Sequence, residues 1–398
     1  MKTLPYTRHS LNEDDIAAVV EVLRGNWLTT GPAVGRFESA LVEVTGARHA
    51  VACSSGTAAL HLATLGTEIG PGDAVVVPTL TFLATANCVR YVGAEVVFAD
   101  VDPETGLMRA EDVRDAIARA EQKNIAAILP VHLNGQTADI EAIASVAQDH
   151  NALVLEDACH AIGGHHLRSG DAVGACRLTA AATFSFHPAK TVAMGEGGAV
   201  TTNDGQLARR IRQLRNHGMS RDAADFANAE LAFAQSGGAN PWYYEMTEPG
   251  YNYRASDIHC ALGVSQLKRL DARVAKRAAL VARYDAALAD RSPALRTLAR
   301  IPDCVPAWHL YVVRIDFDAL GTERAEVMER LSAQGIGTQV HYLPVHLQPY
   351  YRARYGALDL PGAQEYYTHC LSLPLFDSMS EQDVDTVVMH IEDILADG

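Results

Sequence analysis

Residues 181–204 read AATFSFHPAKTVAMGEGGAVTTND, two short apolar runs on either side of a turn that holds three glycines. The pattern predicts strand, turn, strand, with Lys190 just after the first strand. Burial there would lower the pKa of the amine and suit it to attack a carbonyl. The plainer alternative is a lysine whose charged end reaches solvent from a strand end. With five lysines against 28 arginines in the chain, Lys190 is nearly the only candidate for a nucleophilic amine.

Upstream of this segment, apolar runs of four to seven residues alternate with helical patterns. Short continuous apolar strands between helices are typical of a mostly parallel sheet that helices cover on both faces. In such sheets, ligands bind at the carboxyl ends of the strands. The expected strands lie at 74–78, 95–101, 125–132 and 152–158, and a further one ends near residue 55.

The pattern changes after residue 217. Residues 218–250 are irregular and rich in aromatics, which favours an excursion over a surface or into a site. A helical pattern over 256–271, a long polar helix to about residue 290 and further elements predict a smaller α+β lobe. We therefore expect a large lobe over 1–250 and a small lobe over 251–398. At the N-terminus, the run from Ser10 to Glu13 resembles a capping box that opens a helix at Asp14.

Composition excludes several classes of function. The formal net charge of −15 argues against a nucleic-acid surface. Apolar runs are too short for a transmembrane helix, and the first residues do not read as a signal peptide. Seven scattered cysteines without a CxxC motif predict reduced thiols and a cytoplasmic location.

Two polar groups are expected at strand ends of the large lobe. Gly56 and Thr57 open a predicted helix after a strand, which suits either a phosphate or a simple N-cap. Asp157 ends a buried strand and needs a cationic partner, either a pyridinium nitrogen or an arginine. His160 follows closely, and a core histidine bonded to the backbone is the commoner fate of such a residue.

Two further side chains each allow two interpretations. Ser185, with His187 nearby, could bind the same phosphate or bond its own strand. Phe82, at the head of a helix, could stack on a flat cofactor or pack on the sheet. The Cys159-His160 and His165-His166 pairs match no common zinc spacing, so we expect no metal.

Together these residues supply what pyridoxal 5'-phosphate needs: phosphate ligands, a ring stacker, an acid for the ring nitrogen and an amine for the aldehyde. Five ordered segments resemble the DegT/DnrJ/EryC1/StrS family of fold-type I, pyridoxal-phosphate-dependent sugar-nucleotide aminotransferases. They are SSGTAALHLA, PTLTFLATAN, EDACHA, FSFHPAK with GEGGAVTTND, and GYNYRASDIHCALGVSQLKRLD.

The resemblance implies a role for each residue. Lys190 would form the Schiff base, Asp157 would pair with the ring nitrogen, His160 would support the ring and Phe82 would stack on it. The implied phosphate ligands are Gly56, Thr57, Ser185 and, from the second subunit of a homodimer with shared sites, Asn252. Lysine rather than histidine at position 190 favours amine transfer over dehydration. Candidates for gripping the substrate are Thr29, Thr30, His187, Arg254, His341 and Tyr342, for which loop and interface structure is an equal alternative.

Three segments, HGMSRD, PWYYEMTEPGYNYR and HYLPVHLQPYY, are similar to the branch of this family on the pseudaminic acid route. That likeness implies a UDP-4-keto-6-deoxy-N-acetylhexosamine as acceptor and L-glutamate as amino donor. Alternatives are a dTDP- or GDP-linked 4-keto sugar, a sugar dehydratase, or a regulator that binds the cofactor without catalysis.

Overall fold

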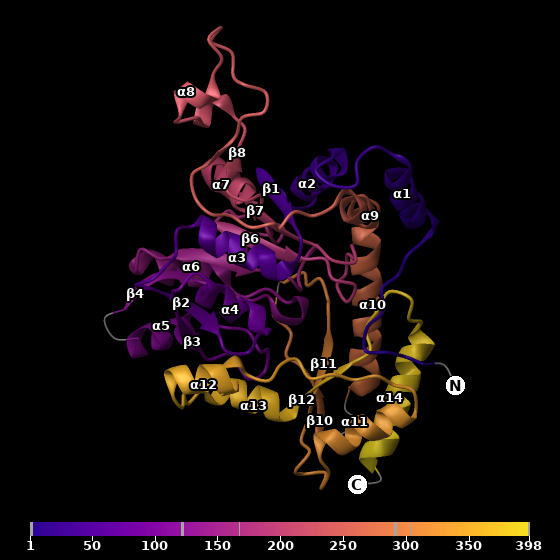
Figure 1. Ribbon diagram of the computed structural model, residues 1–398. Coiled ribbons are helices and arrows are strands. Elements are labelled where there is room, and N and C mark those ends of the chain that lie inside the picture. Colours follow the sequence, from indigo (N-terminus) through magenta and orange to yellow (C-terminus); the bar gives the residue numbers. More distant parts are fainter. Residues whose placement is uncertain (1–2, 121–122, 167, 290–292, 303, 397–398) are drawn as a thin grey trace.

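A seven-stranded mixed sheet forms the centre of the large lobe in the computed structural model (Figure 1), which describes residues 3–120, 123–166, 168–289, 293–302 and 304–396. The strand order is β1-β7-β6-β5-β4-β2-β3, and only β7 runs antiparallel to its neighbours. The sheet therefore confirms the expected mostly parallel α/β fold. The strands are β1 (His49–Cys53), β2 (Asp73–Pro78), β3 (Glu95–Ala99), β4 (Asn124–Ile128), β5 (Leu153–Asp157), β6 (Ala181–Ser185) and β7 (Gly198–Thr202).

Helices bury both faces of this sheet, as the continuous apolar strands require. One face packs against α3 (Gly56–Gly66), α4 (Leu83–Tyr91) and α7 (Gly205–Leu214). The other packs against α5 (Ala110–Arg119) and α6 (Ile140–Asp149) at the β2–β4 side, and against α2 (Pro32–Thr45) and α9 (Asp257–Leu267) at the β6–β7 side.

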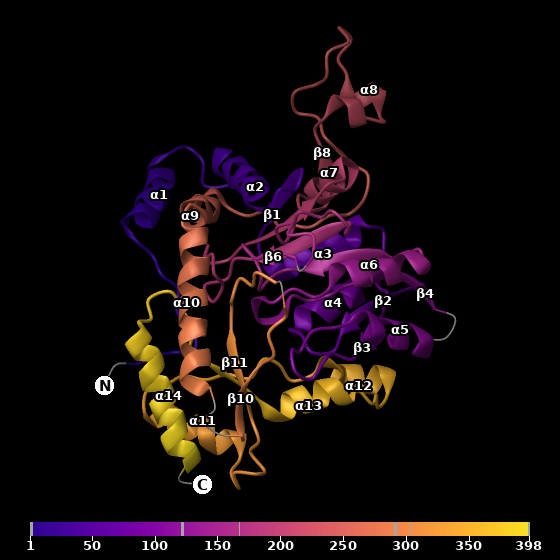
Figure 2. The same cartoon turned by 180° about the vertical axis from the view of Figure 1, so that it is seen from behind.

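A second core lies in the C-terminal lobe, at the foot of the long helix α10 (Leu270–Leu288) (Figure 2). There α11 (Arg324–Ala333) and α14 (Glu381–Ala396) pack on an antiparallel sheet in the order β10-β11-β12. Its strands are β10 (Leu295–Thr297), β11 (Tyr311–Ile315) and β12 (Cys370–Leu373), and α12 (Pro349–Tyr355) and α13 (Pro361–His369) run beside the large lobe. The boundary between lobes at 250/251 stays a prediction.

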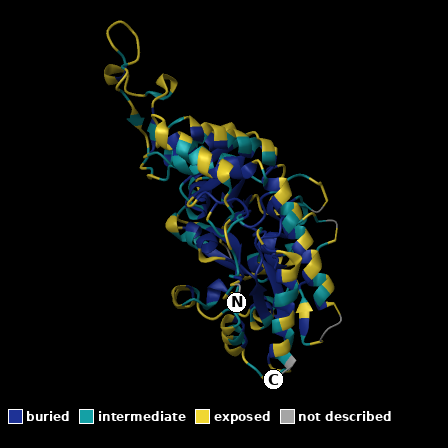
Figure 3. Cartoon of the chain, turned by 90° about the vertical axis from the view of Figure 1, so that its right-hand side faces the viewer, coloured by how far each residue is buried: buried dark blue, intermediate teal, exposed yellow. Residues whose placement is uncertain are grey.

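The irregular segment 218–250 projects from the body of the molecule (Figures 1 and 3). It contains the paired strands β8 (Met219–Ser220) and β9 (Glu245–Met246) and the short helix α8 (Ala229–Ala232). Four of its large apolar side chains are exposed: Leu231, Trp242, Tyr244 and Met246. Most residues of this arm are exposed in the single chain.

The first helix begins differently from the sequence expectation. Asn12, not Ser10, is the N-cap of α1 (Glu13–Arg24), and it exchanges hydrogen bonds with Asp15. The capping box is thus formed by Asn12 and Asp15. Asn is as good an N-cap residue as Ser, and the carboxylate of Asp15 accepts from the N–H of Asn12 as a Glu at that position would. None of the helices in the described ranges combines the length and apolar character that crossing a membrane requires.

Gly198 couples the sheet to the helix that begins the candidate site. A Cβ atom at Gly198 would lie 2.1 Å from the backbone oxygen of Ser55, the N-cap of α3. We predict that Gly198→Ala lowers the free energy of unfolding by about 1–3 kcal/mol, because backbone must move to admit the methyl group. Gly35→Ala is the matched control, since nothing lies within 4 Å of that helical position. Urea unfolding should show Gly35→Ala unchanged or stabilised by about 0.5–1 kcal/mol; equal effects would contradict the argument.

Candidate active site

A cavity of about 590 Å³ opens at the carboxyl ends of the central strands, where segments of the small lobe face the large lobe. This volume falls within the usual range for small-molecule and cofactor sites. Ten of the residues proposed from the sequence line it together: Gly56, Thr57, Phe82, Asp157, His160, Ser185, His187, Lys190, His341 and Tyr342.

Lys190 reaches this cavity from the turn after β6. Its backbone N–H donates to the carbonyl of His187, and Met194 N–H donates to Phe186, so the turn closes on the end of the strand. Its Nζ lies 3.4 Å from Nε2 of His309. Burial lowers the pKa of Lys190, against the opposing charges of Cys159 and Asp157. The amine is therefore easier to hold in its neutral, nucleophilic form than a surface lysine.

Asp157, the last residue of β5, presents a buried carboxylate to the same cavity. Thr85 donates its hydroxyl proton to Oδ2 at 2.7 Å, and the N–H of Cys159 donates to Oδ1 at 3.2 Å. These two donors fix the carboxylate, and within the described part of the chain no lysine, arginine or histidine forms an ion pair with it. A protonated ring nitrogen is the kind of group that such a carboxylate can stabilise.

The N-terminus of α3 forms the other end of the cavity. Ser55 is the N-cap and accepts a hydrogen bond from the N–H of Ala58. Gly56 packs so closely on Ser185 that an added Cβ would lie 2.7 Å from its side chain. The backbone N–H groups at a helix start and the nearby hydroxyl make a suitable cradle for a phosphate.

His160 and Tyr342 form the wall between these two ends. His160 Nδ1 accepts a hydrogen bond from the N–H of Asn134 at 3.4 Å, which leaves the proton on Nε2, 3.3 Å from the Tyr342 hydroxyl. Burial and the charge of Lys190 lower the pKa of His160. Phe82 is 55% exposed and faces Tyr342 at a ring distance of 6.1 Å. An exposed ring at the cavity mouth fits stacking better than packing on the sheet.

Four proposed residues do not line the cavity in this chain. Thr29 forms a bridge to Ser256, and Asn252 to Asn216. Arg254 donates to the side chain of Asn216 at 2.6 Å. The fourth, Thr30, is exposed.

Sequence reasoning missed Thr85 and His309. Thr85 belongs to the quoted motif PTLTFLATAN, and its position in the first turn of α4 was a usable signal. His309 lies 119 residues from Lys190 in the sequence. Nothing in its local pattern indicates that it contacts the lysine.

The family model for DegT/DnrJ/EryC1/StrS aminotransferases matches residues 9–392. This chain belongs to that family. The spore coat polysaccharide biosynthesis protein SpsC of Bacillus subtilis (strain 168) is 41% identical over 396 residues, which cover 98% of this chain and 97% of that protein.

Solved structures agree over the full length. The Helicobacter pylori aminotransferase PseC, involved in the biosynthesis of pseudoaminic acid, superposes with a TM-score of 0.88 at 27% identity, with all of both chains covered. The Streptococcus pneumoniae sugar aminotransferase Spr1654 in its PLP-form gives 0.86 at 26%, covering 100% of this chain and 99% of that one. The enzyme is thus a fold-type I sugar aminotransferase, and its cofactor is pyridoxal 5'-phosphate.

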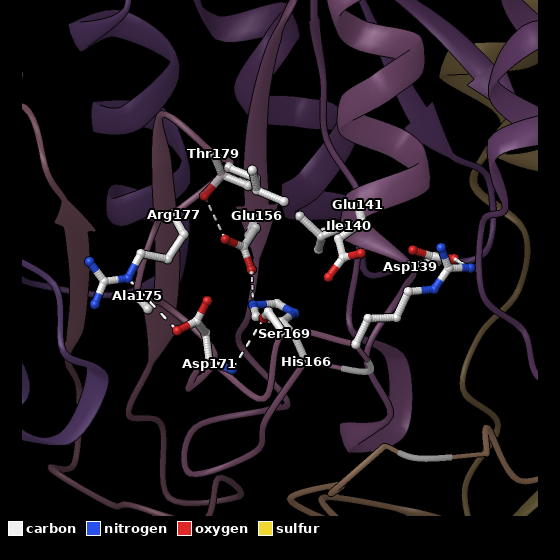
Figure 4. Close-up of a pocket in the computed structure, with 12 residues that line it drawn as sticks. Asp139, Ile140, Glu141, Glu156, His166, Ser169, Asp171, Ala175, Arg177 and Thr179 are labelled. Carbon is white, nitrogen blue, oxygen red and sulfur yellow. Dashed lines mark hydrogen bonds and ion pairs between the residues drawn. The ribbon is translucent and has the colours of Figure 1, made fainter.

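A second, small cavity of about 30 Å³ is lined by Glu156, His166 and neighbouring residues (Figure 4). Beside it, Oε2 of the buried Glu156 lies 2.9 Å from His132 Nε2 and 3.2 Å from His166 Nε2. Two imidazoles and a carboxylate could in principle hold a metal ion. However, His132 Nδ1 accepts a hydrogen bond from the N–H of Ala138, so Nε2 carries the proton that binds Glu156 and offers no lone pair. The group is therefore built as a hydrogen-bonded network.

This network shifts the pKa values of Glu156 and His166 in opposite directions. Burial opposes ionisation of Glu156, but hydrogen bonds from His132 and His166 outweigh it and hold its pKa below the usual range. Burial likewise opposes charging of His166, but the bond and charge of Glu156 raise its pKa. The carboxylate stabilises the fold above pH 4.5 and loses this effect as the pH falls. The imidazolium stabilises it below pH 6.5 and loses this effect as the pH rises.

We predict that Glu156→Gln lowers the free energy of unfolding by about 3 kcal/mol, since it leaves buried partners of a charge unpaired. The difference from wild type should be largest between pH 5 and 6 and smaller at pH 3 and pH 8.5. Urea unfolding at these pH values measures it. Glu141→Gln, at the rim of the same cavity, is the control and should change stability by less than about 0.5 kcal/mol. A pH-independent difference would contradict the assignment of charges.

Proposed function

We propose that the enzyme transfers the amino group of L-glutamate to C4 of a UDP-4-keto-6-deoxy-N-acetylhexosamine, giving a UDP-4-amino sugar for a pseudaminic acid-type surface glycan. The convergence of Lys190, Asp157 and the start of α3 on one cavity carries the chemistry. The sugar rests on the segments 241–254 and 341–351 and on the likeness to PseC.

In the proposed mechanism, the cofactor holds the amino group and accepts electron pairs into its ring when bound. Lys190 would hold the cofactor covalently at rest and, once released, its amine would remove the proton from the donor's α-carbon. Later it acts in the opposite sense, so that a proton ends at C4 of the sugar. Asp157, whose carboxylate is held by hydrogen bonds from Thr85 and the Cys159 N–H, would stabilise the positive ring nitrogen.

The remaining residues are proposed to bind the cofactor and the substrate without taking part in proton transfer. Gly56, Thr57 and Ser185 are the proposed phosphate ligands. Phe82 would stack on the ring, and His160 would support it. His187, His341 and Tyr342 face the sugar, and Thr29 and Thr30 the nucleotide. Burial and the charge of Lys190 lower the pKa of His341 to about 3, so it binds as a neutral group.

A second copy of the chain would complete the site. Among the described residues that line the cavity, Lys190 is the only lysine and none is an arginine. A diphosphate and the two carboxylates of glutamate need more positive charge than this wall provides. The exposed arm and the exposed side chains of Trp27 and Leu28 offer the apolar surface that a partner would cover. We propose a homodimer in which Asn252 and Arg254 of each copy reach the other's cavity.

Two further proposals concern the division into lobes and the location of the enzyme. We propose that the lobes divide between residues 250 and 251. All seven cysteines are free thiols, which supports a reducing, cytoplasmic location.

The composite site predicts complementation between two inactive variants. Lys190→Ala removes the amine, and Asn252→Ala removes the phosphate ligand lent to the other copy, so each homodimer should lose at least 100-fold in kcat. Mixed dimers should carry one intact site and recover up to a quarter of wild-type activity after subunit exchange. Steady-state assays before and after exchange measure this. Full activity in a solution of monomers would refute the proposal.

The proposed acceptor predicts an order of substrates. The value of kcat/KM with saturating glutamate should be highest for a UDP-4-keto-6-deoxy-N-acetylhexosamine, at least 100-fold above dTDP- and GDP-linked 4-keto sugars, since a site that bonds a group rejects analogues lacking it. Selection between C5 epimers should be weaker, because the nucleotide supplies binding energy to both. A dTDP sugar without an N-acetyl group as best substrate would overturn the acceptor alone. Loss of the sugar's oxygen without gain of nitrogen would indicate a dehydratase.

A further inference from the structure

His309 is a buried histidine in contact with the amine of Lys190. It lies two residues before the start of β11, and its side chain is almost fully buried. The backbone holds it firmly, because its N–H donates to the carbonyl of Asn134 at 2.9 Å and its own carbonyl accepts from Arg277 at 3.3 Å. Its ring packs on that of His160 at 4.4 Å. The imidazole therefore has little freedom to turn away from the lysine.

The hydrogen bonds of His309 determine where its proton resides. Nε2 lies 3.4 Å from Lys190 Nζ, whereas Nδ1 is buried without a hydrogen-bond partner. A proton on Nδ1 would leave a buried N–H unpaired, which is rare and costly in proteins, while an unpaired acceptor is tolerated more often. The proton is thus assigned to Nε2, which donates to the lysine. An ammonium group has no lone pair to accept it, so this contact suits only the neutral amine.

We propose that His309 is a positioning residue that donates a hydrogen bond from Nε2 to the free amine of Lys190 and so keeps that amine unprotonated whenever it is not bonded to the cofactor. This inference rests on the proposed role of Lys190. It adds a requirement to that role, because a displaced lysine that picks up a proton from water can no longer take one from the donor.

The charged groups around this pair act in both directions. Asp157 and Cys159, from the end of β5 and the turn after it, favour the ammonium form of Lys190. Facing His309 from other elements are His160, His341 and Arg277, and together with burial and Lys190 they lower its pKa. The imidazole therefore stays neutral and cannot repel the amine by a charge of its own. The charge of Asp157 favours protonation of Lys190. A hydrogen-bond donor that stabilises the neutral amine opposes this effect.

The test uses the full-length enzyme loaded with pyridoxamine phosphate, in which Lys190 is not bonded to the cofactor. Competitive acetylation with isotope-labelled acetic anhydride from pH 6 to 10, read by peptide mass analysis, gives the fraction of neutral amine at Lys190. The exposed Lys268 serves as internal reference. With His309→Leu, labelling of Lys190 at pH 7.5 should fall about threefold to tenfold, the equivalent of one hydrogen bond, because the open cavity lets water solvate the ammonium. With His309→Gln, whose amide can donate from a similar place, it should stay within about twofold of wild type.

His150→Leu, an exposed histidine at the end of α6, is the matched control and should change nothing. Circular dichroism of each variant confirms folding, and if His309→Leu does not fold, His309→Ala, which also lacks a donor, takes its place. Unchanged or increased labelling of Lys190 in His309→Leu, or in His309→Ala where that replaces it, would overturn the proposal.

Borohydride reduction of the wild type loaded with pyridoxal phosphate separates the two levels of inference. Cofactor found on another lysine would refute the proposed role of Lys190 itself. If the cofactor is found on Lys190 but labelling of Lys190 is unchanged in His309→Leu, only the role of His309 is refuted.

Discussion

The arrangement of the rest of the site depends on two consecutive carboxylates on the central strand of the sheet. Glu156 and Asp157 end β5, and side chains of a strand alternate between faces. Glu156 turns into the protein, where two histidines and Thr179 satisfy it, and Asp157 turns into the cavity. Because two adjacent buried charges would repel, each needs its own partner. One is satisfied by the chain, and we propose that the other pairs with the cofactor.

Much of the fold could be predicted because the strands are short, apolar and buried on both faces. The pattern of β2 needs no knowledge of distant residues, since every side chain from Ala74 to Pro78 is buried. Details that depend on tertiary contacts were harder. The start of α1 was placed at the wrong cap, because Asp15 also accepts from Gln266 and Arg269, more than 250 residues away. These contacts select the register of the cap.

The site shows the same division. Residues within one strand-and-turn motif, such as Asp157 and Lys190, carry a chemical reason for their type, and on that ground the sequence predicts their roles. His309 and Asn134 carry none that is local. His309 meets the lysine only because the small lobe folds back over the ends of the strands. Sequence patterns report which face of an element is buried, but not which distant group lies against it.

Asn134 shows how one turn can govern two side chains of the cavity. Its φ of 62° lies in the left-handed region, which Asn tolerates better than most residues. In this conformation its N–H donates to His160 while its carbonyl accepts from the N–H of His309. Gly135, which follows, has no room for a side chain, since a Cβ would lie 2.1 Å from the carbonyl oxygen of Ala307. The turn thus fixes both imidazoles relative to each other, and substitutions at the two histidines should be coupled rather than additive.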